Sequence, residues 1–319
     1  MIQIALKKLL YVVLMLFLIS LISFIAVHLA PNSFLSGGEL NPNMTKEAVE
    51  ALKEIYGLDK PLLTQYTDWI KNLLLFNFGV SFVSGIPVIE EISKRIGITL
   101  TMNIITLVVV FIISIYLGIK AAFHSDRKLD LLIRQFSLIS FSMPSFYLAL
   151  LLIILFSLEL GWFPISGLHS LEVKEGIAYY IDMLWHIVLP VFVMIFVSIG
   201  SMTMYIRSLT LEILKSDYYF FAKARNLSNK KILKDFIIPN LLPPIVTLLG
   251  LSLPGLIGGS VILEAIFGID GMGQLFYSSA LSRDYPVIMG ILIIGAFLTL
   301  VGNVIADLIL LKINPFTKR

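Results

Sequence analysis

Long apolar stretches separated by short polar segments dominate the chain. A helix needs roughly 20 apolar residues to cross about 30 Å of hydrocarbon, and six stretches reach that length. The sequence therefore predicts an all-α integral membrane protein with six transmembrane helices. These helices are expected over residues 9–29, 96–119, 136–158, 184–206, 240–263 and 286–306.

The first of these stretches could instead be a signal peptide, because Lys7 and Lys8 precede an apolar run near the N-terminus. A signal peptide has an apolar core of about 7–15 residues followed by small residues at a cleavage site. The run over residues 9–29 is longer, and no clear A-x-A site follows it. We therefore expect an uncleaved membrane helix.

Composition supports a membrane protein. Hydrophobic residues make up 58% of the chain and charged residues 14%, and the mean hydropathy is +0.93. A soluble protein this apolar could not cover its surface with polar groups. The chain has no cysteine, which excludes disulfides, thiolate chemistry, iron–sulfur clusters and Cys-rich zinc sites.

Lysine and arginine gather in alternate loops, and such loops are usually cytoplasmic. The two short loops on the other side hold Lys174 and Arg283. We therefore expect both termini in the cytoplasm and an extracytoplasmic loop over residues 31–95. The basic segments are residues 1–8, 120–135, 207–238 and 312–319.

The extracytoplasmic loop is predicted to hold two short helices. Residues 45–56 carry apolar side chains at helical spacing, with Thr45 placed to cap the helix and Gly57 placed to end it. A second helix is expected over residues 62–76, after Pro61.

Ionisable residues are nearly absent from the six apolar cores. The exceptions are expected near helix ends, where water or lipid headgroups solvate them. A stand-alone secondary transporter would need buried coupling charges or inverted repeats, so this pattern argues against one. The residues concerned are Glu159, Glu264, Asp307, His28 and His186.

Enzyme motifs are missing as well. The four histidines form no H-E-x-x-H arrangement, and neither G-x-S-x-G nor the phosphate loop G-x-x-x-x-G-K-[ST] occurs. We expect no catalytic residue, no metal site and no cofactor in this chain, and no nucleic-acid partner. If transport is driven by ATP, the energy must come from another subunit.

Residues 207–238, here called segment 207–238, are too regular for a tether. A first helix is predicted to stop at Asn226, and Ser228 is placed to cap a second helix that ends at Pro239. An apolar face on the second helix opposes a basic one. The segment either docks into a groove on a partner protein or lies on anionic lipid. The basic face is Lys230, Lys231 and Lys234, and the apolar face is Ile232, Leu233, Phe236 and Ile237.

Segment 207–238 resembles the EAA coupling loop of bacterial ABC importer permeases, above all those of the dipeptide, oligopeptide and nickel family. That family usually reads D-Y-x-x-x-A-R-A-K-G-L-S here. Asn226 stands where Gly is common, and Asn is the next-best residue for a left-handed turn. The resemblance implies an ATPase-coupling role for Asp217, Tyr218, Phe221, Ala222, Ala224, Asn226, Leu227 and Ser228.

Other motifs that match the family are spread over nearly the whole chain, and they follow one another in the same order as in the family. One departure is Ile269-Asp270, where family members often have Trp-Pro. The resemblance is to the first, B-type permease and implies the type I ABC importer fold. The motifs are YGLDKPL at 56–62, FGVS at 78–81, SMPSF at 142–146, EAIF at 264–267, GMG at 271–273 and RDYP at 283–286.

The resemblance implies one permease half of an ATP-driven importer for peptides or a similar small solute. Its partners would be a second, related permease, two cytoplasmic ATPase subunits that bind ATP and Mg, and an extracytoplasmic solute-binding protein. The setting would be a bacterial or archaeal cell membrane. Nickel or metallophore import by the same kind of permease is the alternative.

Prolines and glycines mark candidate moving parts. Prolines in membrane helices are either kinks that neighbouring helices tolerate or points where helices rock. Glycines near the fifth stretch either pack helices closely or line a substrate path. The candidate path residues are Ser142, Met143, Pro144, Gly258 and Gly259. The expected organisation is an N-terminal helix (1–30), the loop 31–95, a five-helix core (96–311) and a tail (312–319).

Overall fold

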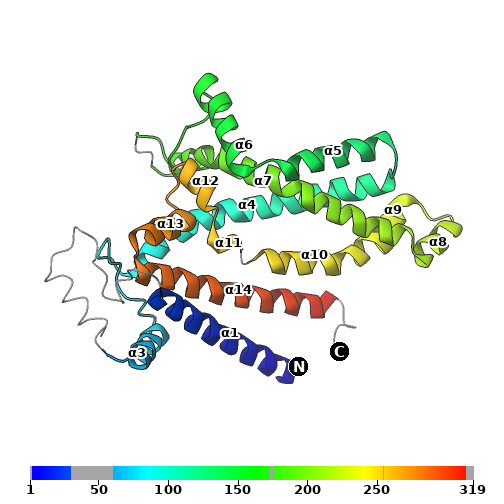
Figure 1. Ribbon diagram of the computed structural model, residues 1–319. Coiled ribbons are helices and arrows are strands. Elements are labelled where there is room, and N and C mark those ends of the chain that lie inside the picture. Colours follow the sequence, from blue (N-terminus) through cyan, green and yellow to red (C-terminus); the bar gives the residue numbers. More distant parts are fainter. Residues whose placement is uncertain (1, 30–59, 173–174, 254, 314–319) are drawn as a thin grey trace. The chain divides into compact units, whose positions relative to one another are not determined.

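The computed structural model describes residues 2–29, 60–172, 175–253 and 255–313 (Figure 1). This part of the chain is helical, apart from turns and one isolated bridge between Val80 and Pro87. The all-α prediction is therefore confirmed. The predicted helix over residues 45–56 lies outside the described residues.

Long apolar helices match most of the predicted spans. Five described segments are long and apolar enough to cross a membrane, or up to six if one bent pair counts as a span. The chain is thus a multi-pass membrane protein. The five segments are α1 (Ile2–Leu29), α4 (Val88–Phe123), α7 (Ile177–Leu214), α14 (Tyr285–Ile313) and the stretch Asn229–Ser252 that ends in α10 (Ile238–Ser252).

The third predicted span is not one straight helix. It consists of α5 (Lys128–Ser142), then α6 (Ser145–Leu152) continued by the π-helical segment η2 (Ile153–Glu159), with a 95° bend between the two parts (Figure 1). Proline disfavours helical backbone in the preceding residue. Met143, just before Pro144, accordingly has extended dihedrals of φ −78° and ψ 119°, so the kink expected at Pro144 is a complete break in the helix.

The fifth predicted span is also broken. After α10 come the short helices α11 (Gly255–Gly258) and α12 (Val261–Ile266). Gly259 has φ +61°, a conformation that glycine adopts readily. Ser260 then starts α12 by accepting a hydrogen bond from the Leu263 N–H at 3.4 Å.

Pro239 does not end a helix, contrary to the prediction. The π-helical segment η3 (Leu233–Ile237) runs directly into α10, and Pro239 lies in the first turn of α10. Pro190 lies inside α7, and Pro243 and Pro244 lie inside α10.

The chain divides into two compact units, residues 1–97 with 271–301, and residues 98–270 with 302–319. The first contains α1, α3 (Leu62–Leu74) and α13 (Met272–Ser282), and α3 confirms the helix predicted after Pro61. The buried Asp284 accepts hydrogen bonds from Ser81 Oγ and from the Phe82 N–H. This carboxylate fixes the turn that precedes α4.

The second unit contains α5 to α12, and α7 packs closely on α4 and α5 within it. A Cβ on Gly118 of α4 would lie 2.8 Å from the Thr203 carbonyl oxygen, and one on Gly200 would overlap the Ser137 carbonyl. Small residues let helix backbones approach each other in membranes. Gly250 likewise faces Ala306 of α14, where an added Cβ would lie 2.5 Å away, so Gly250 lets α10 approach α14 closely.

Candidate functional site

Segment 207–238 begins with the last two turns of α7 and then folds as a helix, a turn and a second helix. The first helix is α8 (Asp217–Ala224), and α9 (Asn229–Ile232) begins the second. Asn226 between them has φ +56°. The Leu227 N–H donates to the Ala222 carbonyl at 3.3 Å, and the Asn226 N–H to the Lys223 carbonyl at 2.8 Å. This pair of bonds is a Schellman motif, and the left-handed turn predicted at Asn226 is confirmed.

Ser228 begins the second helix, as predicted. Its backbone is extended, and its side chain accepts a hydrogen bond from the Lys231 N–H at 3.4 Å. A serine in this position satisfies one of the free N–H groups of the first turn. The turn and the cap together fix the angle between α8 and α9.

The inner face of the segment is apolar and buried. Ala222 is 2% exposed, and it belongs to the same core cluster as Ile232 and Ile237 of the second helix and Ile206 and Ile213 of α7. Ala222 therefore lies beneath the segment, so the coupling role that the resemblance implies for this residue is not a direct contact with a partner on the exposed face. The predicted apolar face of the second helix is confirmed, with Leu233 and Phe236 packed against the same cluster.

The outer face carries two large aromatic side chains. Phe220 is 68% exposed and Phe221 63% exposed, and their rings lie edge to face with centroids 6.0 Å apart. Adjacent exposed phenylalanines on a short helix make this face a candidate interaction surface. Sequence reasoning singled out Phe221 and missed Phe220, although the Phe-Phe pair was the available signal. Other exposed residues of the segment are Tyr218, Lys223, Arg225, Lys230, Lys231 and Lys234.

The candidate path residues flank the two helix breaks of the second unit. Ser142 and Pro144 are exposed and Met143 is half-buried at the bend between α5 and α6. Gly258 ends α11, and a Cβ added to it would meet nothing within 4 Å. The helices that follow the two breaks, α6 and α12, pack in one core through Leu148, Ala149, Leu263 and Phe267.

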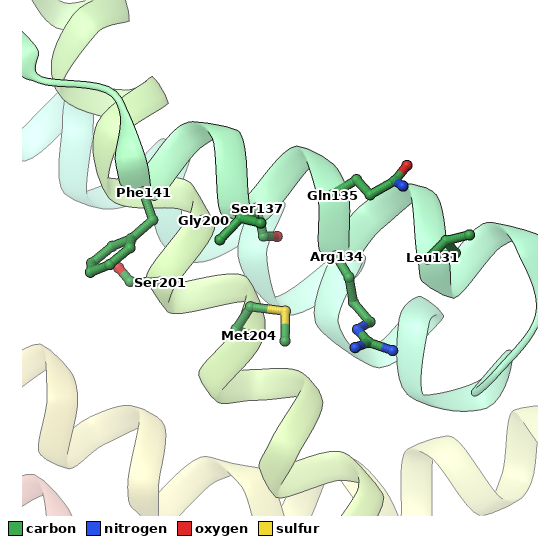
Figure 2. Close-up of a pocket in the computed structure, with 9 residues that line it drawn as sticks. Leu131, Arg134, Gln135, Ser137, Phe141, Gly200, Ser201 and Met204 are labelled. Atoms are coloured by element: carbon green, nitrogen blue, oxygen red, sulfur yellow. The ribbon is translucent and has the colours of Figure 1, made fainter.

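A groove of about 470 Å³ runs between α5 and α7, on the stretch of α5 that leads to Ser142 (Figure 2). Its walls are mostly apolar, with one cation, Arg134. Figure 2 shows Arg134 and Met204 extending from the two helices toward the same side. The other lining residues are Leu131, Gln135, Ser137, Leu138, Phe141, Gly200 and Ser201.

Two residues expected at solvated helix ends are buried instead. Glu264 is 0% exposed, and Thr99 Oγ1 of α4 donates to its Oε1 at 3.2 Å. The break at Gly259 turns α12 into the core, so Glu264 no longer ends a span. His186 is also buried, with its Nδ1 2.7 Å from the Asp182 carbonyl oxygen.

Other ionisable residues fit the expectation. Glu159 and Asp307 are exposed. His28 is half-buried, and its Nε2 lies 3.1 Å from Gln65 Oε1 in the first unit.

Comparison with known proteins agrees with this architecture. Residues 114–319 match the family described as binding-protein-dependent transport system inner membrane component, and residues 1–103 match the N-terminal region of such components. The oligopeptide transport system permease protein AppB of Bacillus subtilis is 36% identical over 298 residues, 93% of each chain.

Two further relatives extend over nearly the full length. The dipeptide transport system permease protein DppB of Lactococcus lactis is 31% identical over 316 residues, 99% of each chain. The glutathione transport system permease protein GsiC of Escherichia coli is 31% identical over 318 residues, 99% of this chain and 98% of the relative. The family matches together cover more than half of this chain, so the chain belongs to the inner membrane components of binding-protein-dependent transport systems and is the permease subunit of an ABC importer.

Proposed function

We propose that this permease carries peptides, or a small solute resembling them, and forms half of the translocation path. The support is that relatives covering almost the entire chain are named for oligopeptide, dipeptide and glutathione transport. These names favour peptides over the nickel or metallophore alternative. The second half of the path is a related permease.

Two cytoplasmic ATPases drive the importer, and an extracytoplasmic binding protein delivers the solute. The single observation that carries the ATPase assignment is the outer face of α8, where Phe220 and Phe221 are exposed on a segment fixed from beneath by Ala222. Exposed aromatic side chains on a rigid helix fit a hydrophobic groove on a protein. The basic residues nearby also suit anionic lipid, which is the competing interpretation of the same segment.

The termini and segment 207–238 face the cytoplasm of a bacterial or archaeal cell. The basic segments of the sequence support this direction. ATP and Mg bind the ATPase subunits, and this chain contributes neither nucleotide binding nor catalysis.

Transport is then a two-state movement. Closure of the ATPases displaces α8 and α9, and the displacement passes along α7 toward the two helix breaks of the same unit. Rigid helices that tilt about such breaks exchange an inward for an outward opening. Ser142, Met143 and Pro144 at one break, and Gly258 and Gly259 at the other, border the solute.

The test is reconstitution of the complete importer in proteoliposomes. This chain is combined with the second permease, the ATPases and the binding protein that are encoded beside its gene. We expect ATP-dependent uptake of a labelled di- or tripeptide that excess unlabelled peptide suppresses. ATP-dependent uptake of nickel, with no uptake or competition by peptides, would contradict the substrate assignment.

A further inference from the structure

A buried ion pair ties the start of α5 to α7. Arg207 donates from Nε to Asp130 Oδ1 and from Nη2 to Oδ2, each at 2.6 Å. The Asp130 side chain is fully buried, and that of Arg207 is 12% exposed. The N–H of Asp126, a residue with φ +63°, also donates to Asp130 Oδ2 at 3.1 Å. A carboxylate held by a planar two-pronged donor has one allowed orientation.

The same helices meet again further along. Ser140 Oγ donates to the Phe196 carbonyl and accepts from the Gly200 N–H, the latter at 3.0 Å. The rings of Phe136 and Phe196 pack edge to face at 5.8 Å. Ten residues separate Asp130 from Ser140, which is about 15 Å of helix. Two attachments this far apart prevent α5 from pivoting on α7.

The C-terminal ends of α7 and α5 connect to two different functional parts of the chain. α7 ends at Leu214, and α8 with its exposed phenylalanines begins at Asp217. α5 ends at Ser142, where the 95° bend and the candidate path residues follow. A displacement of α8 and α9 therefore reaches the bend through α7 and α5 if the latter two helices move as one body.

We propose that Asp130 and Arg207 are positioning residues that transmit the displacement of α8 and α9 from α7 to α5. This inference rests on the proposed function, in which ATPases act on α8 and α9. A buried ion pair is a poor source of net stability, because apolar residues of similar volume often stabilise a protein as well. A fixed mutual orientation of two helices is what the paired geometry supplies.

The experiment uses the reconstituted importer with three variants of this chain. Asp130→Asn removes one charge, Arg207→Lys keeps the charge but loses the planar fork, and Asp130→Asn with Arg207→Gln leaves no buried charge unpaired. The matched control is Glu90→Gln, which breaks an exposed ion pair with Lys94. Each is combined with Ser142→Cys in this cysteine-free chain, and the ATPase rate, peptide uptake and thiol labelling of position 142 are measured.

In the parent complex, we expect trapping of the ATPases with vanadate after ATP hydrolysis, as ADP and vanadate, to change the labelling rate at position 142. In Asp130→Asn and in the double variant, the ATPase rate should stay within about twofold, while the labelling change and the uptake per ATP fall at least tenfold. Arg207→Lys should be intermediate, and Glu90→Gln should match the parent.

Assembled Asp130→Asn or double-variant complexes with the parent labelling change and uptake per ATP would overturn the inference. If Asp130→Asn fails to assemble, the double variant decides by the same readout. Failure of all three variants to assemble would also overturn it, because the pair would then be needed only for folding. If the parent responds to ATP at position 142 but imports no peptide, the substrate assignment fails and this inference stands.

Discussion

The backbone N–H of Leu227 donates to the carbonyl oxygen of Ala222, 3.3 Å away, across the left-handed turn at Asn226. Leu227 and Ala222 also meet in one apolar cluster, as the residues at these positions of a Schellman motif commonly do. The turn therefore ends α8 and also holds that helix against the apolar cluster. The backbone conformation at Asn226 decides where the exposed face of α8 points.

Substitution of Asn226 tests the role of this turn. Asn226→Gly should be tolerated, because glycine reaches positive φ at least as easily. Asn226→Val should destabilise the segment by about 1–3 kcal/mol, because a β-branched residue is strained there. The measurements are copurification of the ATPases and uptake, both normalised to the amount of permease. Equal values for the valine and glycine variants would show that the turn does not position the segment.

Two alanines in α8 form a matched pair, since Ala222 is buried and Ala224 is exposed. Ala222→Glu places a charge in the apolar cluster at a cost of about several kcal/mol, so segment 207–238 should detach from the core. Ala224→Glu should leave the fold intact. Limited proteolysis within residues 217–232 reports the difference, with cleavage enhanced only in the Ala222 variant. Equal protection of both would contradict the burial of Ala222.

Packing between α5 and α7 depends on Gly200. Gly200→Ala puts a Cβ onto the Ser137 carbonyl and near Ser140 Oγ, so the helices must separate. We expect a loss of about 1–3 kcal/mol, the usual range for an overpacked core, seen as a lower midpoint of thermal unfolding in detergent. Gly258→Ala, with open space around it, is the control and should unfold at the parent temperature. A parent-like midpoint for Gly200→Ala would contradict the packing described for these helices.

The direction of insertion can be read from thiol labelling, because the chain has no cysteine. Ser228→Cys should resist a membrane-impermeant reagent in intact cells and react after permeabilisation. Leu171→Cys, in the exposed loop before α7, should react in intact cells of a host whose outer barrier is permeable to the reagent. The reverse pattern would place the termini outside the cytoplasm.

Local features of this chain could be predicted from sequence, whereas features set by distant contacts could not. The turn at Asn226 and the cap at Ser228 depend on a few neighbouring residues, and both were predicted. The bend at Pro144 was predicted only as a possible kink, since the sequence does not tell a tolerated proline from a 95° break. Glu264 is buried beside Thr99, far away in the chain, so its position at the end of an apolar stretch was misleading.

The two faces of α8 show the same limit. Tyr218, Phe221 and Ala222 share helical spacing, and a helix this short does not reveal which of its apolar residues faces the core. The structure assigns Ala222 to the core and Phe220 with Phe221 to the surface. The ion pair between Asp130 and Arg207 joins residues from separate basic segments, and nothing in the sequence linked them.

The most direct test of the account is whether the exposed face of α8 holds the ATPases. Phe220→Ala with Phe221→Ala removes both rings without touching the buried cluster, and Lys230→Gln with Lys231→Gln is the control for attachment to anionic lipid. The measurement is the amount of ATPase that copurifies with each permease variant from the complete importer. We predict at least a tenfold loss of ATPase for the phenylalanine variant and little change for the lysine variant. Full retention of the ATPases by the phenylalanine variant would contradict docking through this face and favour attachment of the segment to the lipid surface.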